Sequence, residues 1–211
     1  MAGIVSCVEQ IAASIGMNCE SPLVGGYTGR AVLIPISAIG EGTNQIICNV
    51  TRNIVQFGKA PSTPVLVAVD NTMVLTPFDG SQTAGSGDDG FSKFTKAFAF
   101  RIPERGAVLS VKVIEPLMHG GRFIAVLEKE QKVGDGGFEV VGLENSLRVV
   151  DPSTVTRQEN ANGGAWLVTL QCRESKAEYV IGHDNAPPSD IEYESAKAEF
   201  EKLWNACMNV A

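Results

Sequence analysis

The chain of 211 residues is long enough to bury one sizeable core, and its 44% hydrophobic and 19% charged residues match an ordinary globular domain. Its formal net charge of −7 argues against a protein that grips nucleic acid through a basic face, although an acidic surface lets nucleic acid slide past without sticking. The first residues lack the basic lead of a signal peptide, and no apolar run is long enough to cross a membrane. Five cysteines without C-x-x-C spacing indicate reduced thiols, so we expect folding in the cytoplasm.

The N-terminal third of the sequence predicts an irregular arm followed by short strands. Residues 1–29 carry several turn signals and are expected to form an arm that leads into a β-rich core domain over 30–182. β-Branched apolar runs at 31–36, 45–50 and 65–69 predict the first strands of that core. The run at 65–69 is apolar throughout, so we expect it to be covered on both faces or to lie at an interface.

Residues 76–93 break this pattern. The segment opens on the sequence TPFDG and contains the sequence GSGDDG, a composition that predicts a long, flexible, acidic loop. Loops of this length inside a compact domain are usually functional or disordered.

The residues of this acidic loop disfavour two kinds of ligand site. The sequence GSGDDG at 85–90 matches the dinucleotide pattern G-x-G-x-x-G, but Asp88 and Asp89 would repel a pyrophosphate, and the residues that follow predict a strand instead of a helix. Asp79 could join these two carboxylates around Ca²⁺, but the spacing fits no EF-hand. A solvated acidic loop is the simpler interpretation.

The middle of the chain predicts a series of further strands, of which several alternate apolar and polar residues. They lie at 94–102, 107–114, 122–128, 138–142, 165–172 and 179–181. In the first of these, the phenylalanines share one face that Lys96 interrupts. The sequence GDGG at 134–137 predicts a hairpin turn, and Gly142 predicts a fixed corner where a strand passes into a loop.

The C-terminal segment 189–210 predicts an amphipathic helix of about five turns. Ser189 and Glu192 have the spacing of a capping box at its start. Aromatic and aliphatic residues, Phe200 and Trp204 among them, then follow helical spacing along one stripe. We favour packing of this stripe on its own domain over docking on a neighbouring subunit.

Catalytic signals are weak in this sequence. The only histidines are His119 and His183, and neither has a cysteine partner at metal-ligand spacing. His183 is followed by Asp184, but adjacent residues on an extended chain point to opposite sides, and no G-x-S-x-G elbow is present. We therefore expect a non-enzymatic protein with no catalytic, cofactor-binding or metal-binding residues.

The order of these segments resembles the structural, tail-tube-like proteins encoded by phages and prophages of Bacteroidetes hosts. The resemblance covers roughly residues 20–181. It is carried by the sequences GGYTGR at 25–30, VLIPI at 32–36, TPFDG at 76–80, the Phe-rich run at 94–102, RFIAVL at 122–127, FEVVGL at 138–143 and GAWLVTL at 164–170. The helix at 189–210 lies outside it.

The resemblance implies a mainly β fold, a β-sandwich or barrel, whose subunits form stacked, usually hexameric rings. Its partners would be copies of itself and other virion proteins, with DNA passing through an acidic lumen without sequence-specific binding, and with no membrane and no cofactor. Its place would be the virion tail, assembled in the host bacterial cytoplasm. By this analogy the inter-subunit contacts would lie in the loop at 76–93 and on the C-terminal helix, at Phe78, Asp79, Gly85, Asp88, Asp89, Phe200 and Trp204.

Other functions remain open from the sequence. A head–tail connector or a capsid decoration subunit would also be rich in strands, and the extra helix would suit either. A carbohydrate-binding β-sandwich module is a different class, but it needs exposed aromatics, and Trp166, Trp204 and three tyrosines supply a stacking platform poorly. A hydrolase that uses His183 would need a nucleophile and an orienting group that the sequence does not place.

Overall fold

The structure is a computed structural model of the full chain. It describes residues 27–39, 46–49, 54–57, 67–70, 78–86, 92–102, 107–130, 137–157, 166–176, 178–181 and 193–208.

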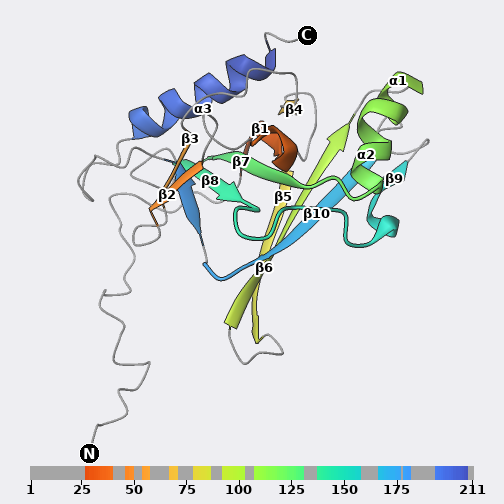
Figure 1. The fold of residues 1–211 in the computed structure, drawn as a ribbon, viewed down its shortest axis with the longest axis horizontal. Helices are drawn as coiled ribbons and strands as arrows, with labels where there is room; N and C mark the ends of the chain where they lie inside the picture. Colours follow the sequence, from red (N-terminus) through yellow and green to blue (C-terminus); the bar gives the residue numbers. More distant parts are fainter. Residues whose placement is uncertain are drawn as a thin grey trace, which may run out of the picture.

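Two β-sheets and one long helix make up the described part of the chain (Figure 1). The strands are β1 Tyr27–Pro35, β2 Ile46–Asn49, β3 Ile54–Phe57, β4 Val67–Asp70, β5 Phe78–Ser86, β6 Ser92–Ile102, β7 Phe123–Lys129, β8 Phe138–Val141, β9 Thr156–Arg157, β10 Trp166–Glu174 and β11 Tyr179–Ile181. The helical segments are η2 Ile36–Ala38, α1 Ala107–Leu109, the π-helical turn η3 Ser110–Ile114, α2 Glu115–Met118, η5 Pro152–Thr154 and α3 Tyr193–Met208. The fold is mainly β with a C-terminal helix, as the sequence predicts.

The two sheets differ in size. The larger has the strand order β2-β3-β11-β8-β7-β1-β4, and the smaller has the order β5-β6-β10-β9. All pairings are antiparallel except that of β11 with β3. The hairpin predicted around 134–137 is confirmed, because β7 pairs with β8 from Ala125–Val141 to Glu128–Phe138.

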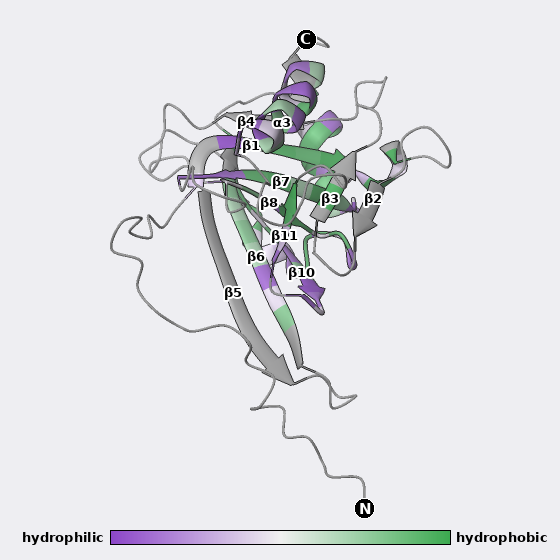
Figure 2. Ribbon diagram, turned by 90° about the vertical axis from the view of Figure 1, so that its left-hand side faces the viewer, coloured by the Kyte–Doolittle hydropathy of each residue, from purple (hydrophilic) through white to green (hydrophobic). Residues whose placement is uncertain are grey.

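The larger sheet is the middle layer of three. On β1, Ala31 and Leu33 face the smaller sheet, whereas Val32 and Ile34 belong to the core formed with α3. β7 follows the same alternation, and its first six residues are buried. Figure 2 accordingly shows hydrophobic colouring along most of β7. A strand covered on both faces has no polar face to alternate with, which explains the continuous apolar runs in the sequence.

Helix α3 covers the face of the larger sheet that is turned away from the smaller sheet (Figure 1). Its apolar stripe packs on that sheet, and the rings of Phe200 and Phe138 stack with centroids 4.9 Å apart. The favoured interpretation, packing on its own domain, is therefore confirmed. The predicted capping residues Ser189 and Glu192 lie outside the described residues.

A short crossing segment closes one side of the sandwich. Leu147 exchanges two backbone hydrogen bonds with Phe123 of the larger sheet, at 2.8 and 2.9 Å. The next residue, Arg148, exchanges two with Gln171 of the smaller sheet, at 2.8 and 3.1 Å. Consecutive residues thus link the two sheets.

Two predictions from the sequence are wrong. The segment 107–114 was expected to be a strand, but it begins a helical stretch over α1, η3 and α2. Its buried side chains Ile114 and Leu117 are three residues apart, while Val108 and Val111 are 68% and 58% exposed. One helical face is therefore buried, and the β-branched alternation that favoured a strand is not used.

The acidic segment 76–93 is the second error. Residues 78–86 form strand β5, and β6 begins at Ser92, so most of the expected loop is one arm of a hairpin. Loop-like composition is overridden here because β6 provides a continuous partner along all of β5. The core also begins earlier than expected, since β1 starts at Tyr27.

Candidate functional site

A long hairpin, β5–β6, is the most prominent projection of the described chain. β5 pairs with β6 along its whole length, and the last pair before the turn is Ser86 with Ser92. β10 flanks β6 on its other side, but its last pair is Glu174 with Phe94. The hairpin therefore continues beyond the point where β10 ends, and Figure 1 shows the paired ends of β5 and β6 extending away from the other described strands.

β5 is an edge strand of the smaller sheet. Among the described strands it pairs with β6 and with no other. It is nine residues long, contains no lysine or proline, and has Asp79 as its one charged residue. Proteins usually protect exposed edges with lysine, proline, bulges or short strands, because a free row of N–H and C=O groups is a template for another strand. β5 has few of these protections.

A buried ion pair lies at the base of the hairpin. Lys96 of β6 points inward between the sheets, and its Nζ lies 2.8 Å from Oε2 of Glu174 on β10 and 3.6 Å from Oε1 of Glu139 on β8. The side chains of Lys96, Glu174 and Glu139 are only 3%, 0% and 8% exposed. The Lys96–Glu174 contact is an ion pair without hydrogen-bond alignment, since neither of its two atoms has a hydrogen-bond partner in the described chain. The buried Lys96 ammonium thus pairs with one carboxylate of each sheet, Glu174 of the smaller and Glu139 of the larger.

The second oxygen of Glu174 fixes the corner after β8. Oε1 accepts hydrogen bonds from the backbone N–H groups of Gly142 and Leu143, at 2.9 and 2.7 Å. Gly142 has φ +91°, and a Cβ there would lie 2.8 Å from the carbonyl oxygen of Phe123. Only glycine fits this left-handed, closely packed position. The strand-to-loop corner predicted at Gly142 is confirmed.

Further polar groups extend the cluster toward its rim. Lys129 Nζ lies 3.2 Å from Glu139 and also pairs with Glu178, while the hydroxyl of Tyr27 donates to Glu139 at 3.2 Å. Burial, reinforced by the Glu139 charge, raises the pKa of Tyr27 above its usual range. Burial alone would lower the pKa of Lys129, but the carboxylates of Glu139 and Glu178 outweigh it and raise that pKa. Tyr27 therefore stays a neutral hydrogen-bond donor and Lys129 a cation at neutral pH.

Cys172 is the buried thiol nearest to this cluster. It lies on β10, two residues before Glu174, and its side chain belongs to the core between the sheets. Burial, reinforced by the charge of Glu174, raises the pKa of the Cys172 thiol to about 12. The thiol is therefore protonated at neutral pH and acts as a small apolar side chain.

A second polar cluster holds α3 on the larger sheet. The Arg30 guanidinium donates to both oxygens of Glu128, at 2.7 and 3.0 Å, and to Glu201 on α3, at 2.7 Å. Its carbon Cζ lies 5.2 Å from the ring centroid of Phe200 and 5.6 Å from that of Trp204. The hydrogen bonds that Arg30 donates to Glu128 are the largest cause that raises the pKa of Arg30. Arg30 thus joins strand β1, strand β7 and α3.

The seven predicted inter-subunit residues separate into three groups. They are Phe78, Asp79 and Gly85 on β5; Asp88 and Asp89, which lie outside the described residues; and Phe200 and Trp204 on the inner face of α3. The last two are 0% and 8% exposed, and they contact the sheet of their own chain. They could reach a neighbour only if α3 left its sheet, so the contact predicted there is already made within the chain. The role of the other five stays a prediction.

Reasoning from the sequence missed the buried ion pair. One signal was present, because Lys96 interrupts an otherwise apolar face of its strand, and a lysine at such a position needs a buried carboxylate. Its partners Glu139 and Glu174 lie far along the chain in two other strands, so no local spacing could identify them.

No chemistry beyond ion pairing emerges from the described residues. Among them, no group of three or more His, Cys, Asp or Glu side chains is placed to hold a metal ion. His119 is exposed at the end of α2, and His183 lies outside the described residues. No helix in the described ranges has the length and apolar character needed to span a membrane.

Comparisons with known proteins assign no family. No protein-family model, no curated protein and no solved structure matches the chain. The resemblance to tail-tube-like proteins therefore rests on the sequence motifs alone and stays a prediction.

Proposed function

We propose that this protein is a non-enzymatic structural subunit that assembles with copies of itself. The observation that carries the proposal is the projecting β5–β6 hairpin, whose strand β5 has one edge that no described strand covers and whose base contains the buried Lys96 ion pair. A projecting arm whose edge pairs with no described strand is suited to pairing with a strand of another copy. Closure of such contacts into a ring would cover the edge in every subunit.

The kind of assembly follows from the sequence resemblance and the charge. A tail-tube-like ring is the proposed form, and a net charge of −7 suits a wall past which DNA moves without sticking. The tube or a tail-associated ring would then be part of a phage virion. A connector or decoration subunit is the alternative in the same class, and it would form single rings or isolated oligomers instead of stacked tubes.

Size-exclusion chromatography with light scattering, followed by negative-stain electron microscopy, tests self-assembly of the purified full chain over a range of concentrations. We expect rings or tubes. A monodisperse monomer at every concentration would overturn the proposal. Single rings without stacking would favour the connector.

Charges placed on the two edges of the smaller sheet test the role of β5. Thr83→Lys with Gly85→Lys adds cations to β5, and we expect it to weaken assembly because edge lysines oppose strand pairing. Thr156→Lys adds a cation to β9, the short strand at the opposite edge, and serves as the matched control. Equal assembly of both variants, with unchanged circular dichroism, would rule out β5 as the contact.

A further inference from the structure

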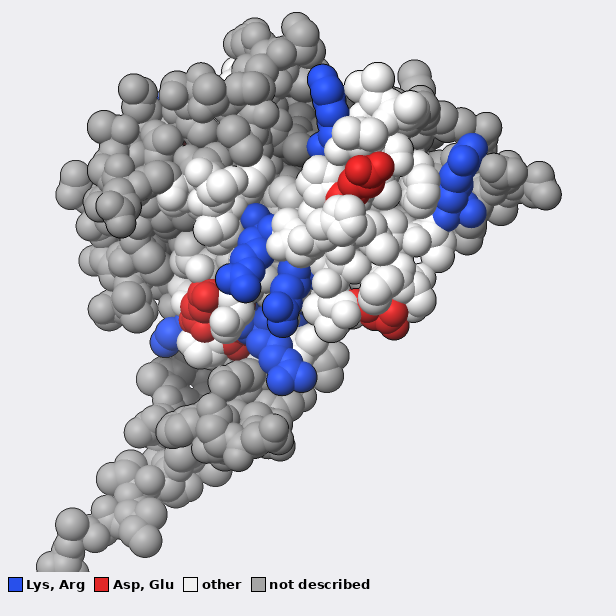
Figure 3. Space-filling view, turned by 45° about the vertical axis from the view of Figure 1, so that its right-hand side comes forward, with Lys and Arg blue, Asp and Glu red and all other residues white. Residues whose placement is uncertain are grey.

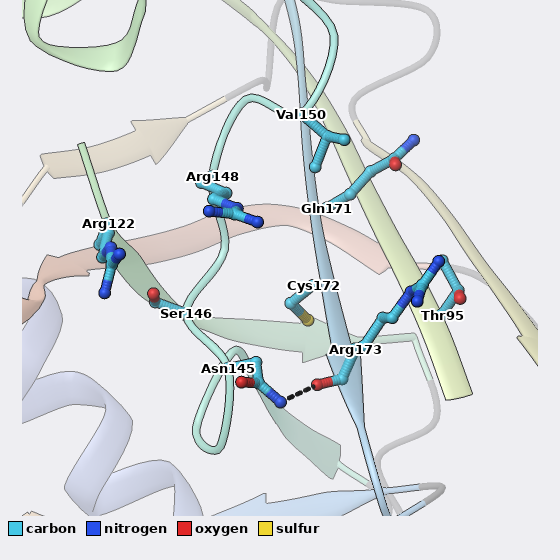
Figure 4. A pocket seen from close by; sticks show the side chains of 9 residues that line it. All are labelled: Thr95, Arg122, Asn145, Ser146, Arg148, Val150, Gln171, Cys172 and Arg173. Atoms are coloured by element: carbon cyan, nitrogen blue, oxygen red, sulfur yellow. Dashed lines mark hydrogen bonds between the residues drawn. The ribbon is translucent and has the colours of Figure 1, made fainter. Parts of the chain in front are cut away.

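A basic pocket lies beside the base of the hairpin. It has a volume of about 610 Å³, and three arginines, Arg122, Arg148 and Arg173, line it together with Thr95 of β6. Figure 4 shows Arg122 and Arg148 on one side of the pocket and Arg173 with Thr95 on the other. On the face drawn in Figure 3, basic side chains gather near the centre. This is an unusual concentration of positive charge on a chain with a net charge of −7.

The backbone of each arginine is held in place. The carbonyl of Arg122 accepts a hydrogen bond from the backbone of Ile36, at 2.9 Å. Arg148 is fixed by its two hydrogen bonds with Gln171, and the carbonyl of Arg173 accepts from Asn145 Nδ2 at 2.7 Å. The three arginine side chains therefore project from fixed backbone positions on three different segments.

The charges of this pocket are not neutralised within the described chain. All three arginine side chains are exposed, and none forms an ion pair with a described carboxylate. Arg30, by contrast, is bound by Glu128 and Glu201. Three like charges around one cavity repel each other, and an anion between them removes that repulsion while it gains hydrogen bonds from planar guanidinium groups. The pocket is thus suited to a ligand with carboxylates or phosphates.

We propose that this pocket receives the acidic turn, residues 87–91, of the β5–β6 hairpin of a second copy of the chain. The turn joins Ser86 to Ser92 and contains Asp88 and Asp89 between two glycines. Two adjacent carboxylates complement three arginines, and arginine binds carboxylates in bidentate fashion. This inference rests on the proposed self-assembly and names the contact that would produce it.

Within one chain, strands β5 and β6 lead away from this pocket. Thr95 lines the pocket and pairs with Thr83, and the hairpin continues through three further residue pairs to Ser86 and Ser92. Three residue steps along a strand place the Ser86–Ser92 pair about 10 Å beyond Thr95. A neighbouring copy can present its turn without breaking these pairs. The arrangement links each subunit to the next in one direction, as a ring or a stack requires.

Charge reversal on each side tests the contact. Arg148→Glu with Arg173→Glu, and separately Asp88→Arg with Asp89→Arg, should each raise the concentration needed for assembly by about tenfold or more. All four changes in one chain should restore assembly, because the charges are exchanged and not lost. Lys112→Glu is the control, since this exposed lysine on η3 lies outside the pocket, and it should leave assembly unchanged.

A peptide separates this contact from the proposed function. A synthetic peptide of residues 84–92 should bind the chain, and Arg148→Glu with Arg173→Glu should abolish that binding even if the wild-type chain fails to assemble. Normal assembly of both reversed variants would overturn the inference and leave the proposed function standing. Loss of binding to a duplex DNA fragment or to inorganic phosphate in the arginine variant, with no effect of the aspartate variant on assembly, would also overturn it and assign the pocket to phosphates.

Discussion

Lys96 and Glu174 form an ion pair of 2.8 Å between two neighbouring strands, and both side chains are buried between the sheets. The register pairs Lys96 with Cys172, so Glu174 is the diagonal neighbour of the lysine along β10. Glu139 approaches the same ammonium from the opposite sheet, at 3.6 Å. The pair therefore lies where β10 leaves the hairpin and where the two sheets approach each other, and it fixes the direction in which the hairpin projects.

Replacing Lys96 with methionine should destabilise the fold strongly. The change leaves Glu139 and Glu174 close together without the central cation, and removal of one partner of a buried ion pair costs about 3–5 kcal/mol. Urea unfolding followed by tryptophan fluorescence measures this free energy. Lys112→Met is the matched control, because Lys112 is exposed, and it should change stability by less than about 0.5 kcal/mol.

A double-mutant cycle between Lys96→Met and Glu174→Gln separates the pair from general loss of packing. The two side chains are in contact, so we expect a coupling free energy of about 1 kcal/mol or more. Additive effects would show that the two charges do not support each other in the folded protein.

Gly142→Ala should be far more destabilising than Gly120→Ala. Both glycines have positive φ, +91° and +87°, so a left-handed backbone at either alanine lowers the free energy of unfolding by about 1–2 kcal/mol. At Gly142 the added Cβ also meets the Phe123 carbonyl oxygen at 2.8 Å and the Leu147 nitrogen at 2.9 Å, whereas nothing lies within 4 Å at Gly120. We expect a loss of about 3 kcal/mol or more at Gly142. Similar unfolding midpoints in urea for the two variants would contradict the close packing at the corner.

The middle layer and the terminal helix were predictable from sequence because their patterns are local. β7 is covered on both faces and gives a continuous apolar run, and the stripe of α3 repeats at helical spacing over its length. Each pattern states which face is buried without reference to a distant partner.

The hairpin and its buried base were not predictable in the same way. β5 has the composition of a loop, and it is a strand because β6 pairs with it. Lys96 finds its partners on β8 and β10, many residues farther along the chain. The segment 107–114 failed for the opposite reason, since its β-branched residues alternate as in a strand while its buried residues Ile114 and Leu117 follow a helix. Long-range pairing thus decides the strand β5 and the partners of Lys96, whereas the segment 107–114 is decided by which of its faces is buried.

Arg30→Met should loosen α3 from the larger sheet. The change removes the two hydrogen bonds to Glu128, the one to Glu201 and the contact over two aromatic rings, and we expect a loss of about 3 kcal/mol. Arg30→Lys keeps the charge but not the planar fork, so about half of that loss should remain. Hydrogen exchange followed by mass spectrometry should show faster exchange in α3.

Lys197→Met is the control for this prediction. Lys197 is on the same helix and pairs with Glu194 at 3.7 Å, but the two side chains are 42% and 74% exposed. An exposed pair of this kind contributes less than about 0.5 kcal/mol. If Arg30→Met changes the hydrogen-exchange rate of α3 no more than Lys197→Met does, Arg30 does not hold the helix.

The Cys172 thiol should resist alkylation in the folded protein. Burial and the Glu174 charge raise its pKa to about 12, from an ordinary value of 9.0. A thiol with the higher pKa is almost fully protonated at pH 8, so its thiolate fraction is about a thousandfold lower than that of an unperturbed cysteine. Because the thiolate is the reactive form, the alkylation rate of Cys172 should keep rising with pH well above 9 and should not level off there.

Iodoacetamide labelling, with mass spectrometry of the peptide that contains Cys172, measures this alkylation rate in buffer and in urea. Ser153→Cys adds an exposed thiol in the same chain as a reference for full access. If native Cys172 is labelled as fast as this reference, the thiol lies outside the core. The burial of Glu174 on the same face of β10 would then be contradicted as well.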